Sequence, residues 1–175
     1  MTACLTAGAL IVTTTITLAA QISVPSSPLS ADAYVSLEKR CGMPKSASPE
    51  SIAALRRARW VPFLHLDQVV ARNGIEVIGG MTAATPGCAP ERFNLFVFAE
   101  GKFAGTVASE AMTPARDEAA GAVRVTGADT ITVEFARYLP GDPECCPSAR
   151  ERVSYRIETK GAGPTLVATG TRQVR

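Results

Sequence analysis

The chain has 175 residues, of which 46% are hydrophobic and 19% are charged, and its formal net charge is +2. This length suits one domain with an ordinary core, and this composition excludes a disordered chain. The small, scattered charge also excludes a nucleic-acid groove, which needs a basic face interleaved with aromatic side chains.

The start of the chain resembles an export signal. Residues 5–20 are uncharged and either apolar or Thr, a stretch that is short for a membrane span but typical of the apolar part of a signal peptide. Ala31-Asp32-Ala33 fits a small-x-small cleavage site, and a cut after Ala20 is the alternative. We therefore expect residues 1–33 to be a signal peptide, or an N-terminal anchor with a tether, and residues 34–175 to form a single α+β domain.

Two helices are predicted before the first strand. A short one is expected over residues 33–40, ending at Gly42. The second starts with Ser48 as N-cap and Pro49 in the first turn, and is expected to run to about residue 59. Trp60 follows it, and we expect this only tryptophan to anchor the core against a sheet.

From residue 66 onward the pattern indicates antiparallel strands. Asn73-Gly74 predicts a hairpin between residues 67–72 and 75–79, although the first of these segments also fits a helical turn. A loop over residues 82–90 holds Cys88, and Phe93–Ala99 then alternates with its aromatic side chains expected on one face. The clearest hairpin joins this strand through a turn at residues 100–102 to residues 103–109.

A second hairpin is predicted from residues 122–126 and 130–138, in which Ile131, Val133 and Phe135 share a buried face. Residues 152–159 and 165–169 add further strands, and no crossover helices separate any of them. The expected fold class is α+β: an antiparallel β-sheet built from consecutive hairpins with one or two N-terminal helices, stabilised by disulfides.

The four cysteines after residue 40 predict disulfides in an oxidising compartment. Cys145 and Cys146 are adjacent, and a planar trans peptide makes it hard for two such thiols to bond to each other. Each is therefore expected to reach a distant partner, Cys41 or Cys88, with the pairing left open among the three connectivities and the vicinal one ranked last. Cys4 precedes the apolar stretch, so we expect it to leave with the signal and to carry no lipid.

Two stretches resemble one family of bacterial envelope proteins. The hairpin Phe93–Thr106 and the cysteine segment Glu134–Ser148 are similar to the LppP/LprE-like proteins, several of which are lipoproteins, and the likeness covers roughly residues 93–158. The resemblance implies an exported envelope protein and carries no established enzymatic activity.

Two other sets of residues could carry chemistry. Vicinal thiolates together with Met43, Met81 or Met112 are a conceivable Cu(I) site, against structural disulfides as the favoured interpretation. His65 with Asp67 nearby allows a Cys–His nucleophilic pair only if a cysteine is free, and an ordinary histidine is favoured.

The functional prediction is an exported, periplasmic or extracellular protein that binds or supports an unknown envelope component or small ligand without catalysis. The alternative is a thiol-dependent redox enzyme or hydrolase using Cys146, or a soft-metal binder. Arg137, Tyr138 and Asp142, beside the cysteine loop, are the candidate binding residues, against the simpler interpretation that the tyrosine packs and the arginine faces water. No cofactor, metal or nucleic acid is expected, and membrane association is expected through residues 5–20 where the signal stays uncleaved.

Overall fold

The computed structural model describes residues 23–42, 47–63, 70–114, 120–143, 145–161 and 163–174. Two helices come first, α1 over Ala31–Cys41 and α2 over Pro49–Arg57. Ser30 caps α1 by accepting a hydrogen bond from the backbone amide of Ala33. Ser48 caps α2 as predicted, and both helices end with basic side chains, which favour the negative end of the helix dipole.

The first sheet follows the helices and has strand order β1-β3-β4-β5, with β2 also paired to β3. All its pairings are antiparallel. The predicted Asn73-Gly74 turn is confirmed, because both residues have positive φ and join β2 to β3. The strands are β1 Val61–Phe63, β2 Val70–Arg72, β3 Ile75–Ala84, β4 Pro90–Ala99 and β5 Lys102–Thr106.

The second sheet is a four-stranded antiparallel meander in the order β6-β7-β8-β9. The predicted hairpin around residues 127–129 is confirmed, and so is the buried face of Ile131, Val133 and Phe135. The last two strands are longer than their sequence patterns indicate. The strands are β6 Ala120–Val125, β7 Thr130–Arg137, β8 Ala149–Lys160 and β9 Gly163–Val174.

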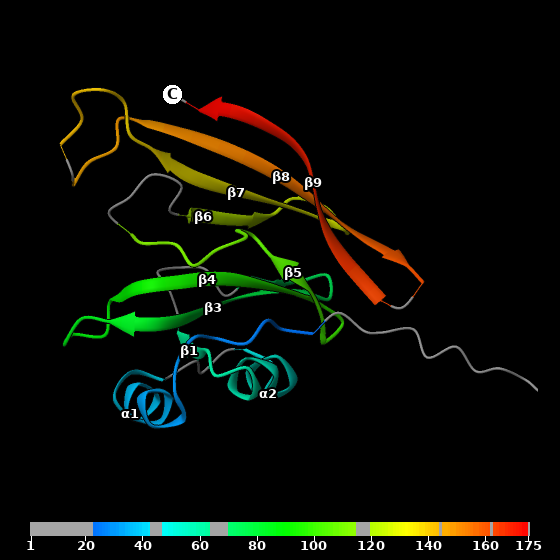
Figure 1. Cartoon of the computed structure of the whole chain (residues 1–175). Helices are drawn as coiled ribbons and strands as arrows, with labels where there is room; N and C mark the ends of the chain where they lie inside the picture. Colours follow the sequence, from blue (N-terminus) through cyan, green and yellow to red (C-terminus); the bar gives the residue numbers. More distant parts are fainter. Residues whose placement is uncertain are drawn as a thin grey trace, which may run out of the picture.

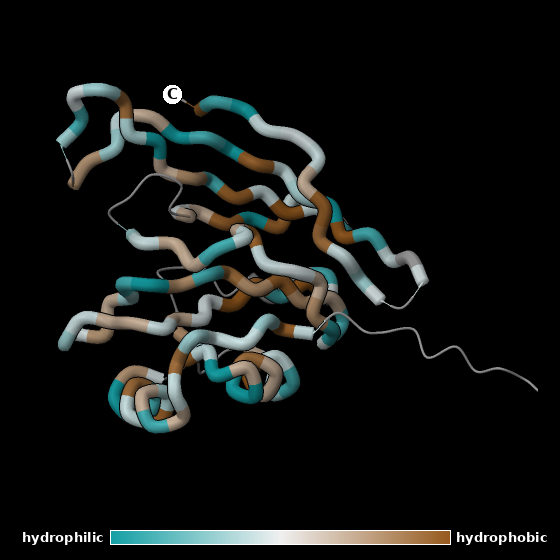
Figure 2. Tube along the Cα trace, viewed as in Figure 1, coloured by the Kyte–Doolittle hydropathy of each residue, from teal (hydrophilic) through white to brown (hydrophobic). Residues whose placement is uncertain are grey.

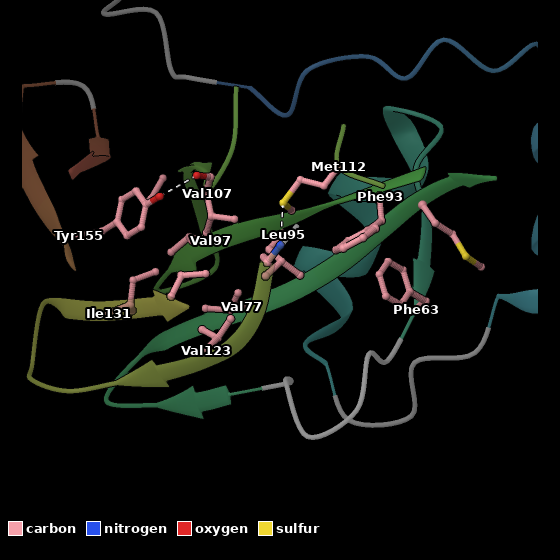
Figure 3. Close-up of a cluster of buried hydrophobic side chains, with 14 of the residues drawn as sticks. Phe63, Val77, Phe93, Leu95, Val97, Val107, Met112, Val123, Ile131 and Tyr155 are labelled. Atoms are coloured by element: carbon pink, nitrogen blue, oxygen red, sulfur yellow. Dashed lines mark hydrogen bonds between the residues drawn. The ribbon is translucent and has the colours of Figure 1, made fainter. Parts of the chain in front are cut away.

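The chain forms three layers: the helices, the first sheet and the second sheet (Figure 1). The largest core cluster lies between the two sheets, where Val77, Leu95 and Val97 of the first sheet meet Ile131 and Tyr155 of the second (Figure 3). A smaller cluster lies between α2 and the other face of the first sheet. Figure 2 shows apolar residues recurring along the helices and along the strands of both sheets. The α+β fold class is confirmed, and the division into two sheets is a feature that the sequence pattern does not contain.

The central strand β4 is buried on both faces, which corrects one prediction. Phe96 and Phe98 face α2, whereas Phe93 faces the second sheet with Phe63, so the aromatic side chains do not share one face. Phe96 packs edge-on against Trp60 with ring centroids 5.0 Å apart, and the predicted anchoring role of this tryptophan is confirmed.

The glycine pair of β3 makes this two-sided packing feasible. A Cβ atom on Gly79 would lie 2.6–2.9 Å from three ring atoms of Phe63 on one face. A Cβ atom on Gly80 would lie 2.7 Å from the ring of Phe96 on the other face. Any side chain at either position therefore forces an aromatic ring to move.

The segment before α1 is hydrogen-bonded to the end of α2. The Trp60 indole donates to the carbonyl of Pro25 at 2.8 Å, and the Ser27 hydroxyl donates to the carbonyl of Arg59 at 2.6 Å. Ala31–Ala33, the predicted cleavage site, forms the first turn of α1. The boundary at residue 33 stays a prediction, and these contacts favour the alternative cut after Ala20, which retains them.

Candidate functional site

A cleft of about 710 Å³ opens between α2, the β4–β5 hairpin, the segment before α1 and the β8–β9 turn; we call it the α2 pocket. Its volume lies within the range of roughly 300–1,000 Å³ that is usual for small-molecule sites. Its wall is mostly apolar or small, with charged side chains contributed by α2 and the hairpin. The lining residues that matter below are Val24, Glu50, Ala54, Arg57, Ala58, Phe98, Lys102 and Phe103.

Local structure fixes two walls of the α2 pocket. The N-terminus of α2 is held to β3 by Glu76, whose carboxylate accepts from the amide of Ser48 at 2.6 Å and from its hydroxyl at 2.7 Å. The opposite wall is the tight turn at Glu100 and Gly101, which both have positive φ. Gly101 faces α2, because a Cβ built on it would lie 3.9 Å from Cβ of Glu50.

The charges of the α2 pocket are one acid and two bases. Glu50 begins α2, Arg57 ends it, and Lys102 starts β5; all three are exposed. Neither cation forms an ion pair with any residue that the structure describes. The pocket therefore combines an apolar wall, to which Phe98 and Phe103 contribute, with a net positive rim.

A second cleft, of about 530 Å³, lies between residues 107–113 and the inner face of β7 and β8; we call it the inter-sheet pocket. Tyr155 crosses it and donates its hydroxyl to the carbonyl of Val107 at 2.7 Å (Figure 3). Burial, together with the nearby Glu151 carboxylate, raises the pKa of Tyr155 to about 12, so the hydroxyl stays protonated. Met112 accepts from the amide of Ala120 through its sulfur at 3.2 Å, as the same figure shows.

Buried Asn94 holds one wall of the inter-sheet pocket in place. Its side-chain amide donates to the carbonyls of Ala108 and Glu110, at 2.8 and 3.1 Å. Backbone bonds between Phe93 and Met112 in both directions continue this attachment to β4. The segment after β5 is thus fixed along the edge of the first sheet.

Of the three predicted binding residues, one lines a pocket. Arg137 lines the inter-sheet pocket, forms an ion pair with Glu151 and lies 5.9 Å from the ring of Phe135. Tyr138 is partly buried just beyond the end of β7, and Asp142 lies in the loop that follows. The three side chains line no common cleft among the described residues, and their role in binding stays a prediction.

The loop between β7 and β8 is organised around Asp142. Its carboxylate accepts from the backbone amides of Leu139 at 2.7 Å and Ser148 at 2.8 Å, which closes the loop. These amide donors stabilise the charged form, so the pKa of Asp142 lies below its ordinary value. Cys145 and Cys146 lie exposed inside this closed loop.

The disulfide pairing corrects the sequence-based prediction. Cys41 is bonded to Cys88, with Cα atoms 5.3 Å apart, and Cys145 is bonded to its neighbour Cys146. The reason is topological: Cys41 ends α1, which packs on β1 and β3, and Cys88 lies in the β3–β4 turn beside it. The vicinal pair instead belongs to a loop of the second sheet, so the two sites are not brought together.

The structure does not support the other residues considered as nucleophiles or metal ligands. His65, Asp67, Cys4 and Met43 lie outside the described residues. Met81 and Met112 are buried in the inter-sheet core. In the part of the chain that the structure describes, no group of three or more His, Cys, Asp and Glu side chains is arranged to hold a metal ion. No helix within the described ranges is long and apolar enough to cross a membrane.

The α2 pocket was not predicted from the sequence. Its residues come from four separate segments, and only the fold brings them together. A local signal does exist for its cations, because a helix that ends in Arg56-Arg57 and a tight turn that ends in Lys102 both present exposed charge.

Residues 75–160 match the LppP/LprE lipoprotein family, a span that runs from β3 to the end of β8. The resemblance predicted from the hairpin and the cysteine segment is confirmed over this span. Lipoproteins are exported and associated with the cell envelope, and the match supports that location for this protein. No curated protein and no solved structure matches the chain.

Proposed function

Because residues 75–160 match a family of envelope lipoproteins, we propose that this protein is an exported envelope protein that binds a ligand without catalysis. The ligand class that the α2 pocket fits is an amphiphile with an acyl-chain-sized apolar part and an anionic group. The observation that carries this proposal is the combination of an apolar cleft of about 710 Å³ with two exposed cations at its rim.

The apolar part of the ligand is recognised by burial. Phe103 is partly exposed and offers its ring to the ligand, and the fully buried ring of Phe98 supports it edge-on, with the two ring centroids 5.7 Å apart. Ala54 and Ala58 leave room above this surface because their side chains are small. Covering apolar area of this kind stabilises a complex by roughly 25 cal/mol per Å² of apolar surface.

The anionic group is recognised by Arg57 and Lys102. Both lie on the rim rather than the floor, so a head group meets them while it remains partly solvated. Rim charges in partial contact with water contribute to specificity more than to affinity. An uncharged amphiphile of the same chain length should therefore bind more weakly, and salt should reduce the difference between the two.

A fluorescence titration with cis-parinaric acid tests the proposal, with the corresponding alcohol as the uncharged control. The wild type should bind the acid more tightly than the alcohol. Ala54→Phe, which fills the cleft, should weaken binding of both probes. Lys102→Gln should weaken binding of the acid alone. Equal binding of both probes by all three proteins, or no binding by the wild type, would exclude the α2 pocket as the site.

The thiol alternative keeps one supporting observation, which is the exposure of the Cys145–Cys146 pair. A nucleophilic Cys146 requires that this bridge first be reduced, because only a thiolate attacks. Thiol titration of the unfolded, unreduced protein distinguishes the enzyme from the binding protein. Two reactive thiols would favour the enzyme alternative, and no reactive thiol would favour the binding function.

A further inference from the structure

We propose that the outer face of the second sheet docks on an anionic phospholipid bilayer through an array of arginines. Alternating residues of β8 point away from the core, and those of the neighbouring strands that pair with them share this side. The face carries arginines from three of its four strands, and we call it the arginine face: Arg124, Arg150, Arg152, Arg156 and Arg172.

Strand register places these side chains in rows across the sheet. Arg152 lies opposite Glu134 of β7 on one side and opposite Arg172 of β9 on the other. Arg150 is one pleat away along β8, with a side chain that is 67% exposed, and Arg156 is 57% exposed. Because neighbouring strands lie about 4.8 Å apart, the array extends in two dimensions.

The acids on this face leave a positive excess. Glu134 is held by Arg152 through a hydrogen bond and by Arg150 at 3.8 Å, and these partners lower its pKa. Asp129 at the β6–β7 turn lies 3.8 Å from Arg156, and Glu158 lies one pleat beyond Arg156 on β8, so three described acids accompany the five arginines. Arg124 on β6 is near enough to Glu134 to help lower the pKa of that acid, but neither Arg124 nor Arg172 on β9 forms an ion pair with any described residue. Both side chains are exposed, so their guanidinium groups are accessible to an external anion.

The open surface of the arginine face favours an extended partner. None of its arginines lines either of the two pockets described above. The outward positions beside the arginines hold Thr132, Ser154 and Gly170 together with two valines of β9, without the aromatic platforms that single-stranded nucleic acids use. Guanidinium forks spread over the open face of this sheet are complementary to an array of phosphate head groups.

Co-sedimentation with vesicles tests this docking on the full chain. One set of vesicles contains phosphatidylcholine alone, and the other contains equal parts of phosphatidylcholine and phosphatidylglycerol. Comparing the two sets cancels the contribution of any apolar insertion. The wild type should prefer the anionic vesicles. Arg124→Gln with Arg172→Gln should lower partitioning into them about 30-fold, since each cation near such a surface is worth about fivefold.

Two further variants test whether vesicle binding depends on the arginine face or only on the net charge of the protein. Arg59→Gln with Arg92→Gln removes two exposed cations from other parts of the molecule and should leave the preference unchanged. Glu134→Gln removes the central acid and should strengthen binding to the anionic vesicles. Equal binding to both vesicle types, or an equal loss in both double variants, would overturn the proposal. Soluble polyphosphate serves as a further probe: binding that depends on Arg124 and Arg172 without any vesicle preference would also overturn it.

Discussion

The two disulfides should contribute different amounts to the free energy of unfolding, and the lengths of the loops they close give the expected difference. The bridge between Cys41 and Cys88 spans a sequence separation of 47, and the chain-entropy relation then gives a contribution of about 4 kcal/mol. The bridge between Cys145 and Cys146 has a separation of 1, and the same relation gives about 0.6 kcal/mol. The two double alanine variants should therefore differ by roughly 3 kcal/mol in their free energy of unfolding.

Urea unfolding followed by circular dichroism measures both values, with the wild type as reference. The reasoning is refuted if the variant that lacks Cys145 and Cys146 loses as much stability as the other. That outcome would mean that each vicinal cysteine closes a long loop with Cys41 or Cys88, as the sequence alone predicts. A loss below about 1 kcal/mol in the Cys41/Cys88 variant would equally refute it.

Three further predictions concern the N-terminal segment, the glycine pair and one ion pair. Deleting residues 1–33 removes a helix cap and two partly buried hydrogen bonds that deletion of residues 1–20 retains, so it should lower the free energy of unfolding in urea by about 3 kcal/mol more. Gly79→Ala should lose about 1–3 kcal/mol because its Cβ meets an aromatic ring, whereas Gly170→Ala, in open space, should change little; equal losses would contradict this. The pKa of Glu134 is lower in the folded protein than its ordinary value of 4.5. Ionised Glu134 therefore contributes fully to the free energy of unfolding above pH 4.5, and this contribution is lost as the pH falls through the folded-state pKa. Glu134→Gln should then be less stable than the wild type at neutral pH, with a difference that narrows on acidification.

Local signals were enough to predict most of the secondary structure. Ser48 and Pro49 mark the start of α2 because their cap and ring geometry are specific to helix starts. Asn73-Gly74 marks a hairpin because both residues accept positive φ. Period-two alternation places Ile131 and its neighbours on the buried face of β7.

What the sequence did not reveal depends on contacts between distant segments. The pattern of β4 is apolar on both faces, and only the packing of α2 on one side and the second sheet on the other explains this. The partner of Cys41 is set by how α1 docks, which no spacing of cysteines encodes. The α2 pocket and the arginine face likewise gather residues from three or more segments.

The most direct test of the binding account is a two-dimensional NMR titration of isotope-labelled protein with a medium-chain fatty acid. The account predicts amide shift changes at the lining of the α2 pocket, centred on Ala54, Lys102 and Phe103, while the lining of the inter-sheet pocket stays unchanged. Shift changes confined to the inter-sheet pocket around Arg137, or a spectrum that the fatty acid leaves unaltered, would contradict it.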